Sequence, residues 1–181
     1  MIIGKNIDLR EIKISDAEFI LALRLDSELN EHISVVEDDL DKQKEWIRRS
    51  KLNKQEWYFI VQNKKKEPVG TIRIYDIKGD SFCWGSWIVV PEARKYASFE
   101  SAFLLYDYAF NDLDFKKTNF DVRKKNQVAL NFYLRFGAVI KDETDLDYLM
   151  LYTKEQFLSK KERYLKVIDK ISQNNIVKKC Y

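Results

Sequence analysis

The sequence predicts one α/β domain of the α+β kind, in which a central mixed, mostly antiparallel sheet of about seven strands carries helices on both faces. Three observations support this class. The 181 residues suffice for one hydrophobic core and are few for two. Apolar residues make up 45% and charged residues 34%, as in ordinary globular domains. Strand-like and helix-like segments follow one another without a repeat, a linker or a break in composition.

The first third of the chain predicts one strand and two helices. Residues 7–12 alternate apolar and charged side chains, which is typical of a strand. Ser15 and Glu18 form a capping-box pattern, so we expect a helix over about residues 16–27. A second helix is expected over residues 40–52.

Three strand-like segments follow and predict an antiparallel meander. They are rich in β-branched and aromatic residues, and short turns with glycine, asparagine, aspartate or lysine join them. We expect these strands over residues 56–62, 69–77 and 81–90.

The second half of the chain begins with helical periodicity. Five apolar residues after Pro91 fall on one helix face: Phe99, Ala102, Phe103, Tyr106 and Phe110. The remaining elements are expected at residues 118–122 (strand), 126–136 (helix), 138–142 and 146–152 (strands) and 155–171 (helix). Gly137 stands where a helix C-terminus favours glycine.

Composition limits the compartment and the ligands. No run approaches the roughly 18 apolar residues that cross a bilayer, and the N-terminus lacks a signal-peptide pattern, so we expect no membrane partner. Two cysteines, Cys83 and Cys180, favour a reducing cytoplasm over a disulfide framework. Two cysteines and a single histidine are too few for a zinc site built from these ligands, so no metal is expected. The basic residues are not concentrated on one helix, so no nucleic-acid partner is expected.

The most informative segment is NQVALNFYLRFGA, residues 126–138. Its N-x-x-A-x-x-F-Y pattern, followed by Phe-Gly-Ala, comes after a short predicted strand. In this respect the chain resembles the GNAT superfamily of N-acetyltransferases, in its ribosomal-protein-alanine and amino-sugar branch. The resemblance implies a GNAT domain over residues 1–153 and acetyl-CoA as co-substrate. Residues 154–181 would be a C-terminal helix and tail that pack on or extend this domain.

The resemblance also implies roles for residues of this segment. Tyr133 matches the tyrosine that protonates the departing CoA thiolate, and a phenol within hydrogen-bond reach can act as such a general acid. Asn126, through the pantetheine arm, and Asn131 would bind the cofactor. Asn126 and Tyr133 are two helical turns apart and project from one face. The alternative is that Tyr133 is a core aromatic beside Phe132 and Phe136.

A second segment, WGSWIVVPEARKYASFE at residues 84–100, resembles the strand and turn that hold the rest of the cofactor. In the family a bulge splays this strand. Backbone N–H groups near Ile88 and Val89 would then face the acetyl carbonyl and stabilise the developing negative charge.

The turn after this strand lacks the glycines usual in the family. Arg94 and Lys95 would supply charge for the pyrophosphate. Ala97 and Ser98 are small enough for close approach, and Ser98 is a candidate helix N-cap. The missing glycines leave open a weakened cofactor affinity, or a CoA-binding domain without turnover.

The acceptor side is expected at an acidic run over residues 25–41, which contains the single histidine. Glu31 or His32 could bind the amine or relay its proton, although His32 could equally be an exposed loop residue. Trp84, Trp87 and Tyr75 could stack on a sugar or nucleotide, although core packing is the alternative for at least two of them.

Two acceptor classes follow from the resemblance. The first is a small-molecule amine such as an amino sugar, which could be nucleotide-linked. The second is a protein N-terminus. The last helix could also form a homodimer contact.

Overall fold

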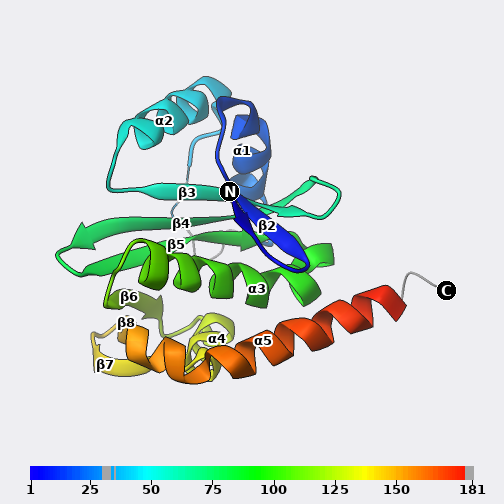
Figure 1. Cartoon of the computed structure of the whole chain (residues 1–181). Helices are drawn as coiled ribbons and strands as arrows, with labels where there is room; N and C mark the ends of the chain where they lie inside the picture. The colour runs from blue at the N-terminus through cyan, green and yellow to red at the C-terminus, as the bar shows by residue number, and fades with distance from the viewer. Residues whose placement is uncertain (30–33, 35, 178–181) are drawn as a thin grey trace.

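An eight-stranded mixed sheet organises the residues that the structure, a computed structural model, describes: 1–29, 34 and 36–177 (Figure 1). The strand order is β1-β2-β3-β4-β5-β6-β8-β7. The strands are β1 (Ile2–Ile3), β2 (Ile7–Glu11), β3 (Trp57–Asn63), β4 (Pro68–Lys78), β5 (Ser81–Val89), β6 (Lys117–Arg123), β7 (Val139–Glu143) and β8 (Asp147–Thr153). The helices are α1 (Ala17–Leu25), α2 (Leu40–Leu52), α3 (Arg94–Asp107), α4 (Gln127–Phe136) and α5 (Lys154–Val177). The predicted fold class is confirmed, and the short β1 is the strand that the sequence did not predict.

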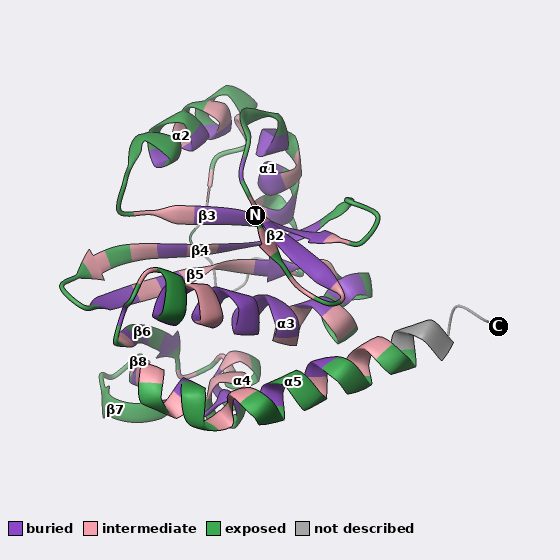
Figure 2. Ribbon diagram, viewed as in Figure 1, coloured by how far each residue is buried: buried purple, intermediate pink, exposed green. Residues whose placement is uncertain are grey.

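Helices cover both faces of the sheet, which explains the continuous apolar run in β3. Tyr58 and Ile60 pack with residues of α1 and α2 in one core cluster. Phe59 and Val61 point the other way and join the larger cluster that contains α3. Both clusters are buried, and β3 and much of α3 are purple in Figure 2. A strand buried on both faces loses its alternating pattern for this reason.

The start of α1 differs from the predicted capping box. Ser15 is exposed and lies in a 3-10 turn before the helix. The carboxylate of Asp16 caps this 3-10 turn, because it accepts the N–H of Lys13 at 2.7 Å, and it makes no capping hydrogen bond to α1. Arg10 holds this carboxylate through Nη1 and Nη2, each at 2.7 Å. The Ser15–Glu18 prediction is therefore wrong, since a contact with β2 selects a different capping residue.

Aromatic rings join α3, α4, α5 and β8 around Phe136, which is 2% exposed. Its ring centroid lies 4.6 Å from that of Tyr164, 5.1 Å from Phe99, 5.3 Å from Tyr106 and 6.0 Å from Tyr152. Aromatic pairs at such separations add to the free energy gained by burial. The cluster therefore stabilises the packing of α3, α4 and α5 on the sheet.

The last helix, α5, contributes to the same core as the rest of the chain. Phe157, Tyr164 and Ile168 are buried on one face of this helix. Leu165 lies on the other face and is 44% exposed. Residues 178–181 of the predicted tail, including Cys180, lie outside the described residues.

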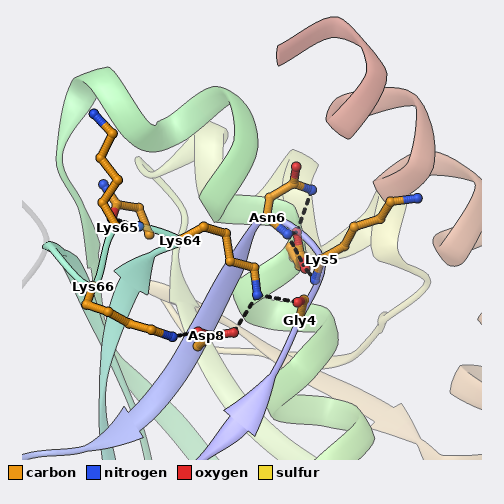
Figure 3. A network of polar contacts seen from close by, with 9 residues as sticks. Gly4, Lys5, Asn6, Asp8, Lys64, Lys65 and Lys66 are labelled. Atoms are coloured by element: carbon orange, nitrogen blue, oxygen red, sulfur yellow. Dashed lines mark hydrogen bonds and ion pairs between the residues drawn. The ribbon is translucent and has the colours of Figure 1, made fainter. Parts of the chain in front are cut away.

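Two lysines of the β3–β4 turn are fixed on a buried carboxylate (Figure 3). The side chain of Asp8 is 1% exposed, and its oxygens lie 2.6 Å from the Nζ atoms of Lys64 and Lys66. Lys64 Nζ also donates to the carbonyl of Gly4 at 2.5 Å. In Figure 3, Lys65 points away from Asp8. Two of the three lysines in this basic run therefore have a structural role.

We expect Asp8→Asn to lower the free energy of unfolding by about 1–3 kcal/mol at pH 7, because it removes two charge-assisted hydrogen bonds from a buried group. Burial opposes ionisation of Asp8, but Lys64 and Lys66 outweigh it and lower its pKa below the ordinary 3.8. The stabilisation is therefore complete above pH 3.8 and is lost as the pH falls through the lower folded pKa. Urea unfolding at pH 7 and pH 3 measures both effects.

Asp114→Asn is the matched control. Asp114 also pairs with two lysines, Lys116 at 2.6 Å and Lys154 at 3.0 Å, but its side chain is 70% exposed. Its φ of 55° suits asparagine as well. We expect no measurable change, because water screens an exposed pair. Equal losses in the two variants would contradict the importance of burial at Asp8.

Candidate active site

The candidate site lies where β5 and β6 diverge. These parallel neighbours pair at Ser81–Lys117 and Phe82–Thr118, and the described register contains no later pair between them. Beyond these two pairs a cavity of about 650 Å³ opens, and residues of both strands line it. A volume of this size suits a cofactor or small-molecule substrate.

A bulge in β5 shapes one wall of this cavity. Two residues, Ser86 and Trp87, lie opposite the single residue Ile72 of β4. Ser86 has φ 46°, a left-handed conformation that is uncommon outside glycine. Thr71 holds it there, because its Oγ1 donates to the Ser86 carbonyl at 2.7 Å. The strand thus carries the bulge that the resemblance implied.

The register after the bulge decides which backbone groups face the cavity. Val90 donates its N–H to Val69 of β4 at 3.0 Å. Alternate residues of an antiparallel strand turn their N–H groups to the same neighbour, so Ile88 also faces β4. Val89 faces the opposite way, and its carbonyl accepts from Arg94 Nε at 3.4 Å. Of the two expected N–H groups, the one of Val89 is directed to the gap between β5 and β6.

The segment expected to form a turn around pyrophosphate is helical. A 3-10 turn over Pro91–Ala93 leads directly into α3, which begins at Arg94. Ser98 therefore lies in the second turn of α3, and its predicted N-cap role is wrong. No residue between 94 and 99 has positive φ, so this backbone does not require glycine. The N–H of Arg94 bonds the Pro91 carbonyl, but the positive end of the helix dipole at the start of α3 still favours an anion.

The side chains predicted to hold pyrophosphate divide into two groups. Arg94 and Ser98 line the cavity. Lys95 is exposed and lies outside the described lining. Ala97 is fully buried in the core, where its small side chain lets α3 pack closely on the sheet.

Tyr133 on α4 lines the cavity. Its ring packs against Phe120 at 4.6 Å and Trp84 at 5.5 Å between centroids. Burial raises its pKa above the ordinary 10.0, and the nearby Cys83, Tyr75 and Asp121 raise it further. The phenol thus keeps its proton at neutral pH, as a general acid must.

Hydroxyl partners distinguish Tyr133 from the tyrosines of the core. Tyr106 accepts from Trp84 Nε1 at 2.9 Å, and the hydroxyls of Tyr152 and Tyr164 lie 2.9 Å apart. Within the described chain, the Tyr133 hydroxyl has no hydrogen-bond partner. A core tyrosine normally satisfies its hydroxyl, so this one is available to a ligand.

The two asparagines of the motif have different surroundings. Asn126 caps α4, because its Oδ1 accepts the N–H of Ala129 at 3.0 Å. It also lines the cavity, and within the described residues its amide N–H groups have no partner. They are therefore free to donate to a ligand. Asn131 is exposed and lies outside the described lining. Gly137 ends α4 with φ 106°, as predicted.

The two predicted tryptophans form the wall between the cavity and the core. Trp84 is 3% exposed, and Trp87 donates its Nε1 to Ser101 at 3.0 Å. Both line the cavity. The other predicted acceptor residues, Glu31 and His32, lie outside the described residues.

Sequence reasoning named Tyr75 but missed the lining residues Arg73, Cys83 and Asp121. Arg73 and Tyr75 share one face of β4, as their spacing of two requires, and Cys83 and Asp121 come from the two diverging strands. Burial raises the pKa of Tyr75, and the adjacent Cys83 adds to this shift. Gly85 makes room for Tyr75, since a Cβ there would lie 3.0 Å from its hydroxyl. The alternation gives the shared face, but only the sheet topology shows that this face borders the cavity.

The described residues hold neither a metal-binding cluster nor a membrane-spanning helix. Among the described residues, no cluster of three or more histidine, cysteine, aspartate or glutamate side chains is arranged to bind a metal ion. None of the described helices combines the length and the apolar character that crossing a membrane requires.

Comparison with known proteins identifies the family. A family model described as an acetyltransferase (GNAT) domain matches residues 6–139. Apo FdhC, a nucleotide-linked sugar GNAT, is 37% identical, with a TM-score of 0.80 over 88% of this chain and 93% of its own. Spermidine N-acetyltransferase from Vibrio cholerae, solved with CoA and spermine, is 19% identical with a TM-score of 0.77 over 86% and 99%, which shows the shared fold. No curated protein matches the chain in sequence. The chain belongs to the GNAT acetyltransferases and is an acetyl-CoA-dependent N-acetyltransferase.

Proposed function

We propose that this enzyme acetylates the primary amine of a small molecule, and that the acceptor is a nucleotide-linked amino sugar. The observation that carries this proposal is the 37% identity to a nucleotide-linked sugar GNAT across nearly the whole chain. The cavity supports it, because Trp84, Trp87 and Tyr75 offer aromatic surface of the kind that sugars and bases contact.

The cofactor half of the cavity fits acetyl-CoA, which supplies the acetyl group as a thioester. The side chain of Arg94 and the positive end of the α3 dipole would bind the pyrophosphate. The amide of Asn126 would donate to the pantetheine arm. The N–H of Val89 would donate to the acetyl oxygen, which gains negative charge when the amine attacks.

Two proton transfers complete the reaction. The amine must lose a proton before it can attack, and Asp121 lines the cavity close enough to Tyr133 for its charge to raise the tyrosine pKa. We assign the role of proton acceptor to Asp121, directly or through water. Tyr133 then donates its proton to the departing sulfur.

A titration with acetyl-CoA followed by assays of thiol release tests this proposal. The amine panel holds a nucleotide-linked amino sugar, the free amino sugar, spermidine and a peptide with a free N-terminus. We expect saturable cofactor binding, and the highest kcat/KM with the nucleotide-linked sugar. Faster release with the peptide would favour a protein N-terminal acetyltransferase, and faster release with spermidine would favour a polyamine enzyme.

A further inference from the structure

We propose that Arg73 forms an oxyanion-binding subsite in the acceptor half of the cavity and holds a phosphate group of the acceptor. The inference rests on the proposed function and deepens it, since it assigns the acceptor an acidic group in addition to its amine. Arg73 lies in the middle of β4 and lines the cavity together with Tyr75. Glu28 and Ser34, which lie in the connection between α1 and α2, line the cavity as well.

The guanidinium group of Arg73 is held in one orientation. Its Nη1 donates to Glu56 Oε1 at 3.1 Å, and the two side chains are 19% and 11% exposed. Its Cζ lies 4.3 Å from the centroid of the Tyr75 ring and 5.3 Å from that of Trp46. A guanidinium stacked on aromatic rings and paired at one nitrogen loses little further freedom when it binds a ligand.

Two nitrogen atoms of Arg73 remain without a partner in the described chain. Its Nε is buried and makes no hydrogen bond. Its Nη2 makes none either, although Nη1 is paired. A buried N–H without a partner is costly, and such groups in native proteins call for an explanation. Nε and Nη2 form the side edge of the guanidinium, which matches two oxygens of a phosphate or carboxylate.

Arg24 adds positive charge to the same side of the cavity. Its Nη2 donates to the carbonyl and Oγ of Ser34, at 3.0 Å and 2.9 Å. Burial lowers the pKa of Arg24, and the charge of Arg73 acts in the same direction, so the two guanidinium groups are electrostatic neighbours. Among the described residues on this side, the carboxylate of Glu56 pairs with Arg73, and that of Glu28 is exposed.

This arrangement selects among amine acceptors. The diphosphate of a nucleotide-linked amino sugar carries the oxygens that fit the unpaired edge of Arg73. A polyamine carries no oxygen atoms for the unpaired edge of Arg73 to bind. A free amino sugar has nothing for Arg73 to bind. The subsite therefore predicts that the nucleotide part of the acceptor contributes to binding through its phosphates.

Inorganic pyrophosphate is the probe for this subsite, titrated by calorimetry into protein saturated with CoA, which fills the cofactor's own phosphate site. We expect saturable binding to the wild type and binding about 10-fold weaker or more in Arg73→Lys, because a lysine lacks the two-pronged edge. Arg48→Lys is the matched control, since Arg48 is exposed on α2, pairs with Glu45 at 3.1 Å and lies outside the described lining. A thermal melt of each variant checks that it is folded.

The kinetic prediction separates ligand binding from a purely structural role. In Arg73→Lys, KM for the nucleotide-linked amino sugar should rise about 10-fold, while KM for acetyl-CoA and kcat/KM for the free amino sugar stay unchanged. Pyrophosphate that fails to bind the CoA-saturated wild type, or binds Arg73→Lys equally well, would overturn the proposal. Equal loss with every amine would also overturn it. If no amine is acetylated but pyrophosphate binds as expected, the subsite stands and the proposed function fails.

Discussion

Tyr133→Phe is expected to lower kcat for acetyl transfer by about 100- to 1,000-fold while leaving the dissociation constant of acetyl-CoA nearly unchanged, because the variant loses only the proton donated to the departing sulfur. The ring that packs against Phe120 and Trp84 is retained, so the cavity wall should remain intact. Single-turnover measurements of thiol release, together with a cofactor titration, separate the two effects.

Tyr148→Phe is the control for the loss of a phenol. Tyr148 lies on β8 under the ammonium of Lys124, 5.3 Å from Nζ to ring centroid, and outside the described cavity lining. Its removal should leave kcat unchanged. A Tyr133→Phe enzyme with the wild-type rate would remove Tyr133 from the mechanism. Since the pKa of Tyr133 is raised above 10.0, the wild-type rate should also show no alkaline decline below pH 10 that is due to this group.

Phe136→Ala is expected to lower the free energy of unfolding by about 3–5 kcal/mol, since it empties the centre of the ring cluster that joins α3, α4 and α5. Phe136 is 2% exposed and lies within 5.3 Å of the rings of Tyr106 and Tyr164. Urea denaturation followed by tryptophan fluorescence measures the change.

Leu134→Ala tests whether the effect is specific to the buried face. Leu134 lies on the same helix but is 42% exposed. Its truncation should change stability by about 0.5 kcal/mol or less. Comparable losses in the two variants would mean that the helix itself, and not the ring cluster, determines the stability.

Elements with strong local signals were predictable from the sequence. The periodicity from Phe99 to Phe110 is confirmed as the buried face of α3 and the turn that follows it. Gly137 ends α4 in the left-handed conformation that glycine adopts without strain. The start of α1 was not predictable, because Arg10 of a neighbouring strand selects Asp16 over Ser15.

The candidate site was predictable only where one segment carries the motif. Asn126 and Tyr133 come from one helix, and both line the cavity. Arg73 and Asp121 come from strands that are distant in sequence, and nothing in either segment shows which cavity they border. The missing glycines near Ala97 suggested a weakened turn, but a helix takes the place of the turn and has no need of positive φ.

The two residue pairs between β5 and β6 join two parts of the sheet at one end of these strands. Near Ser81 and Phe82, hydrogen bonds fix the distance between β5 and β6. At the far end it is set by side chains, among them Trp87 and Phe132, whose rings lie 4.8 Å apart. The width of the gap between β5 and β6 therefore depends on aromatic packing. Substitutions that change the size of these rings can alter which acyl groups and acceptors enter the cavity, although they change no group that takes part in the reaction.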